Sequence, residues 1–215
     1  MLQYKRNQVE EAISRTVGEQ SAKPSSELRI RLKRLLDMDR SLVHNPKSPD
    51  PNKANYAFYS GDSPGKGVEI WFSAYEAFAL LTSLRLLQHN WPQHFAVAVL
   101  RRVRPELEKQ HARILKQDPK ILFNEDEIKR TARPGDIYFG NTDPVLLTII
   151  SRHKPATEGD LKIPPCRICR GMKEVSEFVK QEEVWSYSMF DLVGPAHRLS
   201  SELLAVQPRK RGRSS

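Results

Sequence analysis

The sequence predicts an α+β fold that is mainly helical, with short β elements. Three observations on its 215 residues lead to this prediction. Apolar side chains recur at helical spacing along most of the first 118 residues, short aromatic and β-branched runs interrupt them, and helix-type and strand-type patterns alternate from residue 119 onward. We therefore expect two folded parts, at residues 1–118 and 119–207, followed by a disordered basic tail at 208–215.

Two helices begin the first part. Residues 4–17 place apolar side chains at helical spacing, and Gly18 ends this helix. A turn at 24–26 supplies an N-cap for a second helix over 27–39, which carries a stripe of four leucines. The other sides of this second helix and its C-terminal end are basic: Arg29, Arg31, Lys33, Arg34 and Arg40. The pattern is that of a cationic amphipathic helix directly after another helix.

A β-hairpin is predicted next, after a polar loop at 42–55 that contains Lys53. Residues 56–59 and 68–72 are short aromatic and β-branched runs, and the segment between them, which includes Lys66, is rich in Gly, Ser and Pro. Two such runs around a turn are typical of a hairpin over residues 56–72.

Two further helices complete the first part. Ser73 and Glu76 have the spacing of a capping box ahead of an apolar run, which predicts a helix. A break at 90–92 precedes another helix, which Pro105 kinks or restarts before it continues to about residue 116.

The second part is predicted to be a small α+β unit. A short helix capped by Asn124 comes first, and residues 145–150 form a buried type of strand. A helix over 171–181, a strand over 184–190 and a helix over 194–206 follow. We expect this unit to bind a protein partner or an effector.

The order helix, turn, basic helix, hairpin and long helix is that of a winged helix-turn-helix, a DNA-binding module. Its second helix fits the major groove, where Arg and Lys side chains reach phosphates and guanine edges. Lys66 at the tip of the hairpin and Lys53 before it would contact phosphates. The formal net charge of +9 agrees with an anionic partner.

A resemblance to a known family follows from these residues. The run Glu27-Leu28-Arg29 resembles the Thr-Leu-Arg that opens the recognition helix of MerR-type regulators. Ile70-Trp71-Phe72-Ser73 with Glu76, and Asn90-Trp91-Pro92-Gln93, are similar to later landmarks of that family. The resemblance covers about residues 4–103. It implies that Arg29 contacts DNA and that a helix near 106–116 lies where family members dimerise.

The tail carries a second basic feature. Arg211-Gly212-Arg213 is similar to the core of an AT-hook, which lies in the narrow minor groove of A·T-rich DNA. A general electrostatic arm is the alternative, and in a eukaryote the same run could serve as a nuclear localisation signal. Whether it acts as an AT-hook or as an electrostatic arm, the tail would add non-specific affinity for DNA through Arg209, Lys210, Arg211 and Arg213.

Catalytic and metal-binding patterns are sparse. The sequence lacks a phosphate-binding glycine loop, a metalloprotease motif and a nucleophile elbow. Cys166 and Cys169 have the spacing of half a zinc site, but no second pair exists, so we expect no metal and no cofactor. A nuclease using Asp136, Asp143 and Asp191 is an alternative without a supporting spacing.

The sequence therefore predicts a sequence-specific regulator of transcription that binds double-stranded DNA, forms a homodimer and is not an enzyme. An adaptor that binds an acidic protein surface, or a metal-dependent enzyme acting on nucleic acid, are the alternatives. Without a signal peptide or an apolar run long enough for a membrane span, we expect a cytoplasmic protein, associated with the nucleoid in a bacterium or nuclear in a eukaryote.

Overall fold

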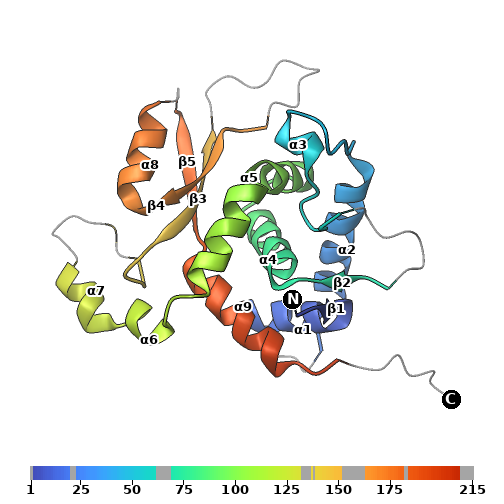
Figure 1. Cartoon of the computed structure of the whole chain (residues 1–215), viewed down its shortest axis with the longest axis horizontal. Coiled ribbons are helices and arrows are strands. Elements are labelled where there is room, and N and C mark those ends of the chain that lie inside the picture. Colours follow the sequence, from blue (N-terminus) through green and yellow to red (C-terminus); the bar gives the residue numbers. More distant parts are fainter. Residues whose placement is uncertain are drawn as a thin grey trace. The chain divides into compact units, whose positions relative to one another are not determined.

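The computed structural model in Figure 1 describes residues 2–19, 23–61, 69–131, 137, 139–151, 163–181 and 184–208. The chain forms two compact units. Unit 1 contains Met1–Arg101 together with Arg198–Ser215, and unit 2 contains Arg102–His197. The fold class is α+β, as predicted.

This division differs from the predicted boundary at 118/119. The reason is that the C-terminal end of the chain returns to unit 1. Gln8 Nε2 donates a hydrogen bond to the carbonyl of Val206 (3.0 Å), and the Arg15 guanidinium lies 3.6 Å from the carboxylate of Glu202. Local sequence patterns cannot predict these contacts, because the contacting residues are almost 200 positions apart in the sequence.

Unit 1 is mainly helical. Its elements are β1 (Tyr4–Lys5), α1 (Arg6–Thr16), α2 (Ser26–Ser41), α3 (Pro51–Ala54), β2 (Trp71–Phe72), α4 (Ala74–Gln88), the first part of α5 (Gln93–Ile114) and the last part of α9 (Val193–Ala205). Helix α4 packs against α1 and α2 and is buried along most of its length. The predicted capping box begins α4, because Ser73 Oγ accepts from the N–H of Glu76 (3.2 Å) and Glu76 accepts from the N–H of Ser73 (2.7 Å).

The predicted hairpin over 56–72 is wrong. Residues 56–59 form no strand, and β2 pairs with β1 instead, with Tyr4 opposite Phe72 and Lys5 opposite Trp71. The physical reason is that a side chain takes the backbone donors of this segment. The N–H groups of Ala57 and Phe58 both donate to the carboxylate of Asp39.

Helix α5 runs through Pro105 as one helix. A proline has no N–H, so the carbonyl of Arg101 loses its normal donor in the next turn. The side-chain amide of Asn55 donates to that carbonyl instead, at 3.5 Å.

Unit 2 is built around a three-stranded antiparallel sheet. Its elements after α5 are α6 (Pro119–Leu122), α7 (Glu125–Thr131), β3 (Val145–Ser151), β4 (Cys166–Arg170), α8 (Gly171–Lys180), β5 (Ser186–Asp191) and the first part of α9. The strand order is β4-β3-β5. Helix α8 packs on the sheet over a core formed by Leu146, Ile150, Cys169, Val175 and Phe178. The predicted strands at 145–150 and 184–190 and the helices at 171–181 and 194–206 are confirmed to within two residues at each end.

Among the described residues, no helix combines the length and the apolar character that crossing a membrane requires.

Candidate nucleic-acid interface

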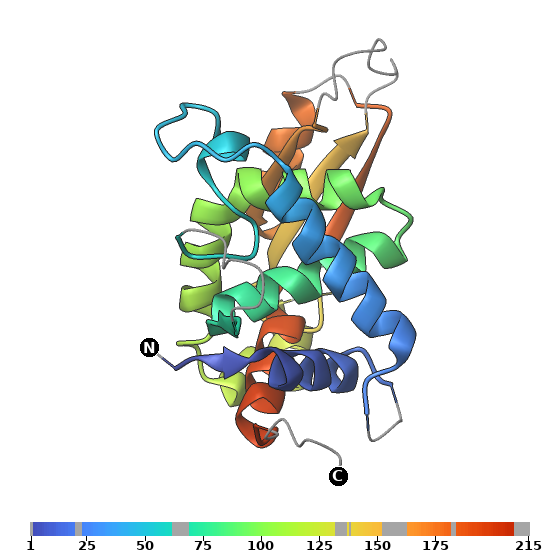
Figure 2. The same ribbon diagram turned by 90° about the vertical axis from the view of Figure 1, so that its right-hand side faces the viewer.

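Helix α2 has a buried face and an exposed face. Ser25 caps its N-terminus by accepting from the N–H of Leu28 (3.1 Å). The four predicted leucines and Asp39 are buried, so the opposite side of the helix is turned to solvent. In Figure 2, α2 runs in mid-blue across the front of unit 1, with α4 behind it. The exposed face is thus held in one orientation by the core.

Three cations and one apolar side chain occupy this face. Arg29, Lys33 and Arg34 are exposed, and they surround Ile30, whose side chain is also exposed. Arg29 lies 3.9 Å from Glu10 of α1, a loose ion pair. Lys33 and Arg34 form no ion pair with the residues that the structure describes. We define Arg29, Ile30, Lys33 and Arg34 as the α2 basic face.

Two other predicted contacts on α2 are already engaged within the protein. Arg31 forms an ion pair with Glu27 one turn earlier, at 2.5 Å. The guanidinium of Arg40 lies over the ring of Tyr59 (5.3 Å) and 3.8 Å from Asp37. The structure therefore gives Arg40 a packing role at the end of α2, which its sequence position did not indicate.

The remaining predicted contacts lie on α3 or outside the described residues. Lys53 is exposed on the short helix α3. Lys66 at the predicted wing tip and Arg209, Lys210, Arg211 and Arg213 of the tail lie outside the described residues.

The net charge of the protein is concentrated in unit 1. This unit has 19 Lys and Arg residues against 11 Asp and Glu, whereas unit 2 has 16 against 15. The unit that carries the α2 basic face and the basic tail is therefore strongly cationic, and the other is close to neutral.

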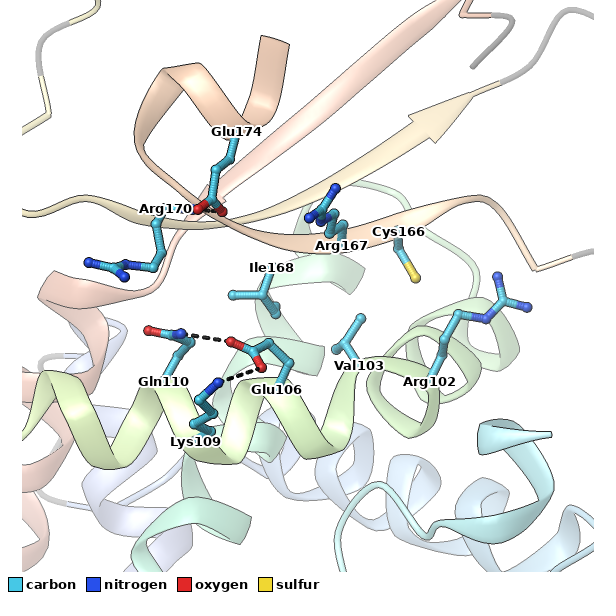
Figure 3. Close-up of a pocket in the computed structure, with 10 residues that line it drawn as sticks. All are labelled: Arg102, Val103, Glu106, Lys109, Gln110, Cys166, Arg167, Ile168, Arg170 and Glu174. Atoms are coloured by element: carbon cyan, nitrogen blue, oxygen red, sulfur yellow. Dashed lines mark hydrogen bonds and ion pairs between the residues drawn. The ribbon is translucent and has the colours of Figure 1, made fainter. Parts of the chain in front are cut away.

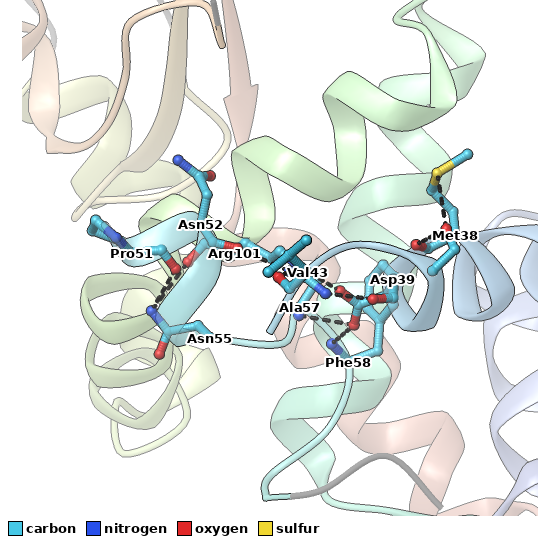
Figure 4. Close-up of polar contacts among 10 residues, drawn as sticks. Met38, Asp39, Val43, Pro51, Asn52, Asn55, Ala57, Phe58 and Arg101 are labelled. Atoms are coloured by element: carbon cyan, nitrogen blue, oxygen red, sulfur yellow. Dashed lines mark hydrogen bonds and ion pairs between the residues drawn. The ribbon is translucent and has the colours of Figure 1, made fainter. Parts of the chain in front are cut away.

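A buried ion pair fixes the C-terminal end of α2. Asp39 and Arg101 are both almost completely buried, and Asp39 Oδ1 lies 2.6 Å from Arg101 Nε (Figure 4). The second carboxylate oxygen accepts from the N–H groups of Ala57 (2.9 Å) and Phe58 (3.0 Å). Both oxygens are thus satisfied, which is the condition for a buried carboxylate to be tolerated.

The same arginine also orders the loop after α2. Arg101 Nη1 donates to the carbonyls of Val43 and Asn52, each at 2.9 Å, and Nη2 donates to the backbone carbonyl of Asp39. Sequence reasoning missed this pair, because its two members are 62 positions apart and neither belongs to a motif. The signal that was available is an acidic residue within the apolar side of an amphipathic helix.

The Cys-x-x-Cys motif does not form a convergent site. Cys166 and Cys169 both lie on β4, three residues apart, so their side chains point to opposite faces of the sheet. Cys169 is part of the core under α8, whereas Cys166 lines a cavity on the other side. Both are free thiols, and no cluster of three or more metal-binding side chains occurs in the described parts of the chain.

Burial raises the pKa of the Cys166 thiol to about 11, which the Arg102 guanidinium beside it offsets only in part. The thiol therefore stays protonated near neutral pH and is a poor nucleophile. Alkylation of Cys166 by iodoacetamide at pH 8, followed by peptide mass spectrometry, is expected to be roughly tenfold or more slower in the native protein than in urea. Equal rates in the two states would show that this thiol is not protected by its site.

Comparisons with protein-family models, with curated proteins and with solved structures give no match. The function is therefore inferred from the residues of the chain itself.

Proposed function

We propose that the protein is a sequence-specific regulator that binds double-stranded DNA, with the α2 basic face in the major groove. The observation that carries this proposal is the coincidence of an exposed cationic helix face with the unit that holds nearly all of the net positive charge.

The α2 basic face has the chemistry that a groove contact needs. Arg29 and Arg34 each offer a guanidinium that can bond a phosphate or the O6 and N7 atoms of guanine, and Lys33 offers a point charge. Ile30 lies among them and provides an apolar surface suited to a thymine methyl group. Because the leucines of the opposite face are buried, the helix presents these side chains without losing its own packing.

Helix α1 precedes α2 and packs against it, as in a helix-turn-helix. The resemblance to MerR-type regulators, which places Arg29 at the DNA, supports the same assignment. The hairpin wing has no part in the proposal, since residues 56–59 form no strand. The basic tail would add affinity that does not depend on sequence.

A charge-matched pair of triple variants tests the proposal. Arg29→Gln, Lys33→Gln and Arg34→Gln together are expected to weaken binding to duplex DNA more than tenfold and to reduce the slope of log affinity against log salt by about 2–3. The measurement is fluorescence anisotropy of a labelled duplex at several salt concentrations. These are exposed side chains, so the thermal unfolding midpoint should change little.

The control removes the same charge from other exposed positions of unit 1. Lys23→Gln, Lys47→Gln and Arg198→Gln together should leave most of the affinity and of the salt slope intact. If both triple variants lose affinity equally, the protein binds by overall charge and α2 is not the contact. If neither loses affinity, the DNA contact lies elsewhere on the chain.

A further inference from the structure

A cavity of about 520 Å³ lies within unit 2, between the part of α5 that begins at Arg102 and strand β4. Figure 3 shows the side chains that line it, which come from one face of the helix, from the strand and from the start of α8. Its volume falls in the range of sites for small molecules. The DNA-binding proposal makes no use of it.

The lining is cationic. The lining includes four basic residues, Arg102, Lys109, Arg167 and Arg170, and two acidic ones, Glu106 and Glu174. The side chain of Arg167 lies on the opposite side of β4 from those of Cys166 and Ile168 (Figure 3), and both carboxylates are engaged inside the protein. Glu106 lies 3.5 Å from Lys109 Nζ and accepts from the amide of Gln110 at 2.7 Å. The carboxylate of Glu174 accepts from the backbone N–H of Arg170 at 2.8 Å.

The four basic and two acidic residues give the lining a formal net charge of +2. Among the described residues, Arg102, Arg167 and Arg170 form no ion pair. Arg102 donates to the carbonyl of Ile163 at 3.4 Å and contacts the thiol of Cys166. A protonated thiol adds no negative charge. An excess of guanidinium charge in a concave site favours an anion with several oxygens.

Strand β4 also has backbone donors along its outer edge. It is an edge strand of the sheet, and β3 is its neighbour on one side. The N–H of Ile150 donates to the carbonyl of Pro165, and the N–H of Gly171 donates to the carbonyl of Pro144. With the register of the two strands, these bonds show that Arg167 and Cys169 are the β4 residues whose backbone groups face β3. Cys166 and Ile168 lie between the bonded positions, so their N–H groups point to the outer edge.

We propose that this cavity binds a small molecule that carries a phosphate or diphosphate group. Arginine forks match the tetrahedral oxygens of phosphate. Arg102 of α5 lies beside Cys166 at one end of the lining, and Arg170 of β4 lies at the other end (Figure 3). The ligand is an effector or a substrate of unit 2, and its binding does not require DNA.

Calorimetric titration of the full chain with inorganic pyrophosphate tests the site, with NaCl used to keep the ionic strength constant. The wild-type protein is expected to bind with a stoichiometry of one. Arg102→Gln with Arg170→Gln should weaken binding at least tenfold.

Two controls separate the site from general charge. Lys116→Gln with Lys120→Gln removes the same charge from exposed positions of unit 2 and should bind pyrophosphate like the wild type. The triple variant of the α2 basic face should also bind it normally, which keeps this result distinct from the DNA-binding test. Absence of saturable binding, an equal loss in the Lys116/Lys120 control, or equally strong binding of acetate would overturn the proposal.

Discussion

Replacing Asp39 by Asn is expected to lower the free energy of unfolding by about 3–5 kcal/mol, the usual cost of breaking a buried ion pair on one side. The variant would leave the buried guanidinium of Arg101 without a counter-charge. It would also replace a charged acceptor of the Ala57 and Phe58 N–H groups by an amide. Urea unfolding followed by circular dichroism gives the difference directly.

Asp37→Asn is the matched control. This aspartate lies two residues earlier on the same helix and is largely exposed, so its replacement should change the unfolding free energy by about 0.5 kcal/mol or less. The double variant Asp39→Leu with Arg101→Met should be less destabilised than Asp39→Asn, because it removes both buried charges. A loss for Asp39→Asn no larger than for Asp37→Asn would contradict the role given to this ion pair.

Acidification from pH 8 to pH 5 is expected to destabilise unit 2 through His111. Burial, with a smaller effect from the nearby His197, lowers the pKa of His111 from 6.5 to about 4, and burial also lowers the pKa of His197. Between pH 4 and pH 6.5 the unfolded chain binds a proton at His111 that the folded chain does not bind. The contribution of His111 to the free energy of unfolding is therefore fully present above pH 6.5 and is lost as the pH falls toward 4. For His111 alone the loss at pH 5 is about 2 kcal/mol.

The variant His111→Gln isolates this effect. Its stability at pH 8 reflects the change in packing, but its loss between pH 8 and pH 5 should be clearly smaller than that of the wild type. His89→Gln, at an exposed position, should retain the full wild-type loss. Urea unfolding at a series of pH values distinguishes the two, and an unchanged pH dependence in His111→Gln would show that this histidine is not the titrating group.

Most helices could be predicted from the sequence because their signals are local. The capping box at Ser73 and Glu76 and the leucine stripe of α2 each lie within a few residues of the structure they determine. Long-range pairings could not be predicted in this way. The strands β1 and β2 are two residues each and lie more than 60 positions apart, and no periodicity arises in so short a strand.

Strand β4 was missed for a different reason. Its sequence, Cys166-Arg167-Ile168-Cys169-Arg170, does not alternate cleanly, and its cysteines suggest a metal motif. In the structure, successive side chains of the strand point to opposite faces, so Arg170 and Cys166 face the cavity and Cys169 lies in the core.

The candidate DNA contacts could be predicted in part. Arg29, Lys33 and Arg34 follow from the helical period, since residues opposite a leucine stripe must be exposed. The engagement of Arg40 by Tyr59 could not be foreseen, because it depends on the path of the loop that Asp39 and Arg101 hold in place. A helical wheel therefore identifies which side chains lie on the exposed face of the helix. The tertiary structure determines which of these side chains are available to a ligand.

Selection of the purified protein on a random duplex library, in a chelator and at physiological salt, tests the central proposal most directly. We predict that one sequence motif is enriched and that the variant Arg29→Ala with Lys33→Ala no longer enriches it. Failure to bind any duplex, or binding without an enriched motif, would contradict a sequence-specific regulator that reads DNA with α2.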